Sequence, residues 1–186
     1  MDATSKNVLA PYINALNTKG EKLVEIWHHG LDHSQDIGTT GNFEFKYTTY
    51  AFQKMHFDSA NNLVKKYLSI QMTAFGAPFN ATDTVAMRVV NENPNYKLVM
   101  YSSVSTNFLL GFKKVNNSVS IETETGKPDF SYFLQQFNSK KSYLGTYMIL
   151  QAHPGYWDAT GFAEFKKILD FLDTQHCVYV LPSELI

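Results

Sequence analysis

The sequence contains one cysteine, no long apolar run and almost no excess of one charge. The single thiol, Cys177, excludes an internal disulfide and a metal cluster held by cysteines. No apolar run approaches the roughly 20 residues that a bilayer-spanning helix needs, and the N-terminus lacks the apolar core of a signal peptide. We therefore expect no membrane partner, and the sequence leaves the compartment undetermined.

The charge of the chain indicates which classes of partner to expect, and its length indicates the number of domains. The formal net charge is -1, and the lysines are scattered instead of forming a basic stripe. We expect no nucleic-acid partner for this reason. The 186 residues are enough for one sizeable core, and no shift in composition divides them, so the sequence predicts a single domain over residues 1–186.

Aromatic side chains are abundant, at 15% of the chain, with eleven tyrosines and fourteen phenylalanines. Such a number leaves rings available to line a surface or cleft, where the faces of sugars stack on them. The alternative is that the rings fill an ordinary α/β core with their polar tips outward. Both interpretations stay open at this point.

Residues 25–34 concentrate three of the six histidines in a short segment, together with the carboxylate of Asp32. The alternating residues 23–27 before them predict a short strand, and Gly30 marks where the chain leaves it. Histidines beside a glycine turn can simply cap the carbonyl groups of a strand. They can also supply ligands or catalytic groups at a strand end.

The spacing of His29 and His33 favours a metal site. Two imidazoles four residues apart can converge on one cation, whether the segment is a helical turn or a tight loop. Imidazole is a good ligand for zinc and neighbouring divalent metals. Asp32 or Asp36 could add an oxygen ligand or orient an imidazole ring.

Helical and strand patterns alternate along nearly the whole chain. Periodicity and capping residues predict helices over residues 7–16, 49–67, 83–90, 130–137 and 162–172. The strand pattern covers residues 23–27, 70–75, 97–101, 119–121, 147–152 and 178–180, with a further apolar stretch at 108–110. This alternation predicts an α/β fold with mainly parallel strands, closed as a distorted or incomplete (β/α) barrel.

Three segments lie at the carboxyl ends of predicted strands, at residues 29–33, 75–80 and 153–157. In α/β folds the loops at the carboxyl ends of the strands carry the chemistry, because they can vary without disturbing the core. We therefore expect these three segments to line one cleft.

Taken in order, these segments resemble the polysaccharide deacetylase family, the carbohydrate esterases with a NodB-type domain. The histidine pair His29 and His33 matches the H-x-x-x-H motif of that family. Residues 75–80 resemble its proline-containing loop, and residues 149–155 resemble the late strand that delivers a leucine and a histidine to the site. The fold that the resemblance implies is a distorted (β/α) barrel.

The chain departs from the family pattern in two places. No paired-aspartate motif precedes Leu16, so the chain is expected to lack the first βα unit and with it the base and the third metal ligand. The proline loop also lacks the usual arginines. Asp32 and Asp36 are the nearby carboxylates, and Asp32 is the candidate catalytic one.

The resemblance implies metal-dependent hydrolysis of an N-acetyl or O-acetyl group on a sugar, with a divalent metal for which zinc is expected. In that function His29 and His33 are the metal ligands, and His153 is the acid or an oxyanion stabiliser. The residues expected to contact the acetylated carbohydrate are Pro78, Phe79, Tyr156 and Trp157.

Two further functions stay open because the expected catalytic aspartates are absent. The chain can be a carbohydrate-binding domain that has kept the fold and lost turnover. It can also be a structural or interaction domain, in which an open sheet edge pairs with another copy to form a homo-oligomer.

Overall fold

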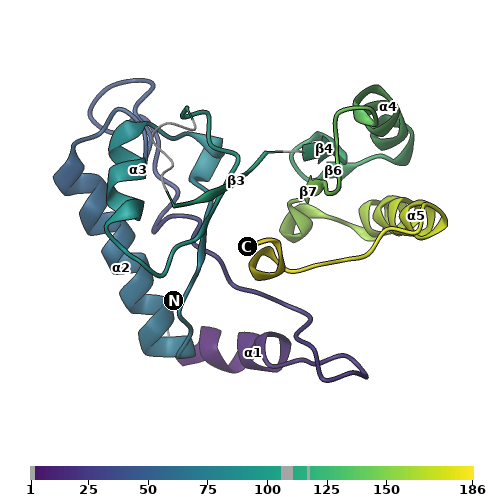
Figure 1. Ribbon diagram of the computed structural model, residues 1–186, viewed down its shortest axis with the longest axis horizontal. Coiled ribbons are helices and arrows are strands. Elements are labelled where there is room, and N and C mark those ends of the chain that lie inside the picture. The colour runs from purple at the N-terminus through teal and green to yellow at the C-terminus, as the bar shows by residue number, and fades with distance from the viewer. Residues whose placement is uncertain (1–2, 106–110, 117) are drawn as a thin grey trace. The chain divides into compact units, whose positions relative to one another are not determined.

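The computed structural model describes residues 3–105, 111–116 and 118–186 (Figure 1). The chain divides into two compact units, which are described separately. Unit 1 comprises Met1–Val115 and Val180–Ile186, and unit 2 comprises Asn116–Tyr179. The predicted apolar stretch at 108–110 lies outside the described residues, and the expectation of a single domain over residues 1–186 stays a prediction.

Unit 1 is built on a small parallel sheet with helices against it. The sheet has the order β1-β2-β3, with strands β1 (Ala74–Phe75), β2 (Leu98–Met100) and β3 (Lys113–Val115). The helices are α1 (Ala3–Ile13), α2 (Tyr50–Leu68) and α3 (Thr84–Asn91), with single 3-10 turns at η1 (Pro78–Asn80) and η4 (Pro182–Leu185).

Two predicted helices of unit 1, over residues 49–67 and 83–90, are found as α2 and α3. The side chain of Thr49 accepts a hydrogen bond from the backbone N–H of Phe52, which caps α2. Asp83 caps α3 in the same way by accepting from the N–H of Ala86. Both helices pack on the core of unit 1, and these predictions are confirmed.

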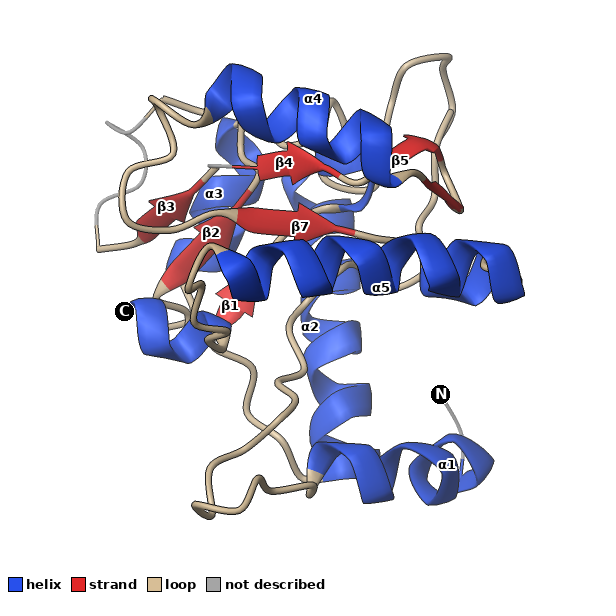
Figure 2. Cartoon of the chain, turned by 90° about the vertical axis from the view of Figure 1, so that its right-hand side faces the viewer, coloured by secondary structure: helices blue, strands red, loops and turns tan. Residues whose placement is uncertain are grey.

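Unit 2 contains a parallel strand pair, a short hairpin and two helices. Strand β4 (Ser118–Ser120) pairs in parallel with β7 (Ile149–Gln151), and β5 (Glu122–Glu124) pairs antiparallel with β6 (Lys127–Pro128). Helix α4 (Phe130–Lys140) packs along β4, and α5 (Ala159–Thr174) packs against α4 (Figure 2). A 3-10 turn, η3 (Pro154–Tyr156), follows β7. The core of unit 2 is apolar and includes Val119, Ile121, Phe133, Ile168 and Leu172.

The structure confirms a mixed α/β fold with mainly parallel strands, but no closed barrel is seen in the described residues. A barrel needs every strand to have two neighbours, whereas the described strands fall into three separate sheets of two or three strands. The antiparallel hairpin of β5 and β6 was not predicted.

Two predicted strands are wrong. Residues 23–27 pair with no strand, because Leu23 and Val24 face solvent instead of a sheet neighbour. Residues 178–180 are extended chain with exposed apolar side chains, and Val178 is 82% exposed. Alternating sequence is not enough for a strand without a partner edge. None of the helices in the described part of the chain combines the length and apolarity that crossing a bilayer requires.

Candidate functional site

The histidine-bearing loop of unit 1 leaves the edge of its sheet beside β1. The backbone N–H of His28 donates to Ala74 O at 2.9 Å, and the N–H of Gly76 donates to His28 O at 3.0 Å. This single parallel bridge fixes the start of the loop at residue 28. Gly30 then turns the chain with a φ of 89°, which favours glycine.

His28 is a core histidine, which the sequence analysis did not single out. Its Nδ1 accepts from the N–H of Gly30, so Nε2 carries the proton and donates to Phe57 O at 3.1 Å. Burial lowers the pKa of His28 from 6.5 to about 4. The hydrogen bond to Phe57 raises this pKa by a smaller amount, and the neighbouring His29 lowers it slightly. His28 is therefore neutral and supports the loop from inside.

The structure brings the two predicted metal ligands together. The ring centroids of His29 and His33 lie 5.3 Å apart. Nδ1 of His29 donates to the carbonyl oxygen of Gly76 at 2.7 Å, which places the lone pair of this ring on Nε2. A histidine that donates one ring N–H to a backbone carbonyl in this way is oriented as metal-bound histidines usually are.

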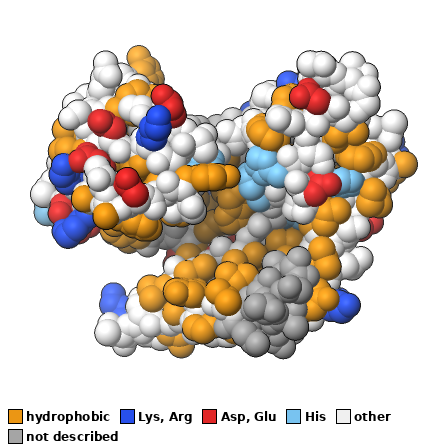
Figure 3. Space-filling view, turned by 180° about the vertical axis from the view of Figure 1, so that it is seen from behind, with side chains coloured by type: hydrophobic (Ala, Val, Ile, Leu, Met, Phe, Trp, Pro, Cys, Tyr) orange, Lys and Arg blue, Asp and Glu red, His pale blue; other side chains and the backbone are white. Residues whose placement is uncertain are grey.

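Aromatic rings continue from this pair in both directions. Trp27 contacts His29 at a centroid distance of 4.9 Å, His33 contacts Phe79 at 4.3 Å, and Phe79 contacts Phe43 at 5.4 Å. We call these five residues the aromatic row. Phe79 is 45% exposed and His33 is also exposed, and Figure 3 shows histidine side chains beside hydrophobic ones on one face of the molecule.

Strained backbone holds two members of the aromatic row. His33 has a φ of 61° and Phe79 a φ of 57°, both in the left-handed region that non-glycine residues rarely adopt. Such strain persists only where the surroundings impose it, and it is common at functional sites. Pro78, a predicted carbohydrate contact, is buried beneath this surface, where an added Cβ on Gly30 would lie 2.7 Å from its Cγ.

A fully buried carboxylate, Glu44, holds the histidine loop in place. Its Oε1 accepts from the N–H of Leu31 at 2.6 Å and its Oε2 accepts from the N–H of His33 at 3.0 Å. The N–H of Glu44 donates in turn to Ser34 O at 3.0 Å. The loop therefore wraps around this carboxylate.

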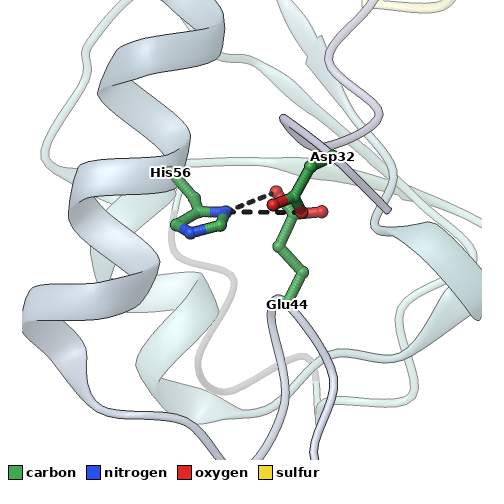
Figure 4. Close-up of side chains that lie close together, drawn as sticks. All are labelled: Asp32, Glu44 and His56. Carbon is green, nitrogen blue, oxygen red and sulfur yellow. Dashed lines mark hydrogen bonds and ion pairs between the residues drawn. The ribbon is translucent and has the colours of Figure 1, made fainter. Parts of the chain in front are cut away.

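His56 and Asp32 complete a cluster with Glu44 (Figure 4). Nδ1 of His56 lies 3.2 Å from Oε1 of Glu44 and 3.7 Å from Oδ1 of Asp32. Oδ1 of Asp32 also accepts from the N–H and the hydroxyl of Ser34. Asp32, the predicted catalytic carboxylate, thus belongs to this cluster, while Asp36 accepts from the N–H of Gly41 within its own turn.

Among the described residues, Asp32, Glu44 and His56 are the only three side chains whose ligand atoms are close enough to hold one metal ion, within 4.8 Å of one another. His29 and His33 belong to no such group of three. That His29 and His33 hold a metal ion stays a prediction.

In unit 2, Glu122 gathers two of the predicted site residues. Its Oε2 accepts from Nδ1 of His153 at 2.6 Å, and its Oε1 accepts from the N–H of His153 at 2.9 Å and from Nε1 of Trp157 at 2.7 Å. Burial raises the pKa of Glu122, but the hydrogen bonds from His153, Trp157 and Gly126 outweigh burial, and the pKa is lowered overall. Glu122 is therefore ionised and orients His153.

A pocket of about 260 Å³ adjoins this pair, lined by residues 118–125, Gln151 and His153. Tyr156 is 76% exposed and packs against Gly126, where an added Cβ would lie 2.5 Å from the Cβ of Tyr156. Trp157 packs instead on Phe165 within the unit. That His153, Tyr156 and Trp157 share a cleft with His29 and His33 stays a prediction.

The sequence analysis missed Glu122 and Glu44, although the sequence around each of them contains a pattern that indicates a functional carboxylate. Glu122 directly follows the buried residues Val119 and Ile121, so the rule that chemistry collects at strand ends could have found it. Glu44 lies between two phenylalanines in a short segment without a clear period. A charge in such a setting is a candidate for a buried, hydrogen-bonded group.

Comparison with known proteins defines the class of fold, which is CE4-like, the fold of NodB-type carbohydrate esterases. One similar solved structure is the crystal structure of a CE4 family pseudoenzyme from Bacillus anthracis, with a TM-score of 0.53 and 11% sequence identity. The match covers 81% of this chain and 42% of that chain. No family model and no curated protein matches. The expected NodB-type resemblance is thus supported at the level of the fold.

Proposed function

We propose that this chain is a CE4-like domain that binds acetylated carbohydrate at the aromatic row and does not remove the acetyl group. The proposal joins two features of unit 1: a continuous surface of rings and an incomplete set of metal ligands. Each feature supports a different half of it.

The aromatic row supports carbohydrate binding. The faces of pyranose rings carry C–H groups that stack on aromatic side chains, and a few polar groups then set the orientation. Phe79 offers an exposed ring face, and His33 and His29 lie beside it with ring nitrogens suited to hydroxyl or amide groups. The strained backbone at His33 and Phe79 fits a surface shaped for a ligand.

The single observation that carries the absence of turnover is the ligand set. A hydrolytic zinc site usually has three protein ligands and an open position for water. Within the described chain no third carboxylate, histidine or cysteine joins His29 and His33 in such a group. Glu44 and Asp32 lie together with His56 instead of with His29 and His33.

A second candidate is the metal-dependent deacetylase, favoured by the orientation of two histidines. His29 donates to the Gly76 carbonyl as a metal-bound histidine would, and Glu122 holds His153 as a proton donor would be held. In that function His29 and His33 bind zinc, Asp32 is the base, and Tyr156 and Trp157 contact the sugar.

The two functions differ in the release of acetate. Titration of an N-acetylated chito-oligosaccharide, followed by calorimetry and by an acetate assay, measures binding and turnover on the same sample. We expect saturable binding without acetate, and at least about tenfold weaker binding for Phe79→Ala, since base or sugar stacking on one ring is worth on the order of 1–3 kcal/mol.

Tyr143→Ala is the matched control, because Tyr143 is 80% exposed and lies outside the aromatic row. Acetate release that disappears in His29→Ala would establish the deacetylase instead. If the protein neither binds the oligosaccharide nor releases acetate, both functions are rejected. The structural or oligomeric role then remains, and light scattering can test it.

A further inference from the structure

We propose that Asp32, Glu44 and His56 form a divalent-cation site in unit 1, separate from His29 and His33. The site joins one imidazole nitrogen, Nδ1 of His56, to one oxygen from each of two carboxylates. It does not depend on carbohydrate binding.

Two of the three spacings between the ligand atoms are close to those of a tetrahedral zinc centre, and all three lie within 4.8 Å. Zinc bonds to nitrogen and oxygen of about 2.0–2.2 Å place neighbouring ligand atoms of a tetrahedron roughly 3.3–3.6 Å apart. Nδ1 of His56 is 3.2 Å from Glu44 Oε1 and 3.7 Å from Asp32 Oδ1. Figure 4 shows the three side chains pointing toward one another.

Each of the three groups is held in place by further contacts. Backbone N–H groups of the histidine loop hold both oxygens of Glu44. The ring of His56 stacks on Phe52 at a centroid distance of 4.0 Å and an interplanar angle of 29°. Ser34 holds Asp32 by two hydrogen bonds. Contacts of this kind orient metal ligands and raise the affinity of a site.

The charge of the cluster favours a cation. Two carboxylates face one histidine, and within the described chain the only ion pairs of Asp32 and Glu44 are with His56. Glu44 is fully buried, where an uncompensated charge is costly. A divalent ion supplies the missing positive charge.

Access and ligand chemistry indicate which ion fits. The side chain of Asp32 is 51% exposed, which leaves the cluster open to solvent on one side for the entry of an ion and for a bound water. The imidazole ligand favours zinc over magnesium, which prefers oxygen ligands throughout.

The test is a calorimetric titration of zinc chloride into the full chain after treatment with a chelator. We expect one zinc ion per chain and at least about tenfold weaker binding for Asp32→Asn, which keeps the shape of an exposed side chain. Asp36→Asn, a carboxylate of the same loop outside the cluster, should leave the affinity unchanged. Magnesium chloride should bind at least about tenfold more weakly than zinc.

X-ray absorption on the zinc-loaded protein identifies the ligands without any variant. We expect one imidazole and the rest oxygen. Two imidazoles, or affinity lost in His33→Gln and kept in Asp32→Asn, would assign the ion to His29 and His33 and overturn the proposal. The proposal would also be overturned if the chain without substitutions does not bind zinc, or if it binds magnesium as tightly as zinc.

Discussion

Glu44 in unit 1 and Glu122 in unit 2 hold histidines by the same kind of contact but in different surroundings. Each carboxylate accepts from a histidine Nδ1 and from backbone N–H groups. The side chain of His56, which faces Glu44, is 6% exposed, whereas that of His153, which faces Glu122, is 39% exposed.

The difference in exposure separates two uses of a carboxylate–histidine pair. The buried carboxylate of Glu44 holds the loop that carries His29 and His33, because it accepts from the N–H groups of Leu31 and His33. The side chain of Glu122 is also buried, at 7% exposed, but its partner His153 is exposed enough to present a ring nitrogen to a ligand beside its pocket. Sequence spacing alone does not distinguish the two.

The largest difference between the two units is expected when Glu44 and Glu122 are each replaced by alanine. Glu44→Ala leaves two backbone N–H groups and His56 without their partner inside the protein, and we expect a loss of about 3 kcal/mol or more. Glu122→Ala should cost about 1 kcal/mol, because the freed His153 is partly solvated. Urea unfolding followed by circular dichroism measures both, and equal losses would contradict the distinction.

The second prediction concerns His28, the buried histidine without a carboxylate. Its pKa is about 4 in the folded state and 6.5 in the unfolded state, so the unfolded chain binds the extra proton. Stability from this group is complete above pH 6.5 and falls as the pH decreases toward 4, by up to about 3 kcal/mol.

Nuclear magnetic resonance can follow the protonation of the His28 ring separately from that of the other titrating side chains. We expect the ring to stay neutral at about pH 5, where most unpaired histidines are charged. A His28 titration midpoint near that of an exposed histidine would show that burial does not control its charge.

The third prediction tests how tightly the loop wraps around Glu44. An alanine Cβ at Gly30 would lie 2.5 Å from Glu44 Oε2, whereas at Gly38 it would meet nothing within 4 Å. Both glycines have positive φ, so the shared backbone cost is about 1 kcal/mol. Gly30→Ala should lose about 2 kcal/mol in all and Gly38→Ala only the shared part. Indistinguishable melting temperatures would refute a tight loop.

The smallest expected effect is the pH dependence of Glu122. Its folded pKa is lowered below 4.5, so its ionised form stabilises the fold above that pH and the contribution is lost as the pH falls further. At about pH 7 the melting temperature of the wild-type chain should therefore be higher than that of the Glu122→Gln variant. The difference between the two melting temperatures should narrow at about pH 3.5. A gap that stays constant or widens in acid would argue against an ionised Glu122.

Local signals in the sequence located the helices well. Thr49, Asp83 and Asp129 each accept from a backbone N–H at the start of a helix that the sequence pattern predicts. A helix cap depends on residues three positions apart, so a short stretch of sequence contains the information.

Strands and buried charges were less accessible to sequence reasoning. Residues 23–27 alternate as a strand does, yet only His28 finds a neighbour, because pairing depends on β1 about 45 residues later. Glu44 became important through its contacts with Leu31 and His33, which lie more than ten residues away.

One measurement tests the central claim of binding without turnover most directly. A chito-oligosaccharide with carbon-13 in its acetyl groups is mixed with the protein and followed by nuclear magnetic resonance, while the His33 and Phe79 ring signals are read from the same tube. The account predicts shifts of both ring signals and acetyl signals that stay on the sugar. Growth of a free acetate signal, or ring signals that do not move at saturating sugar, would contradict it.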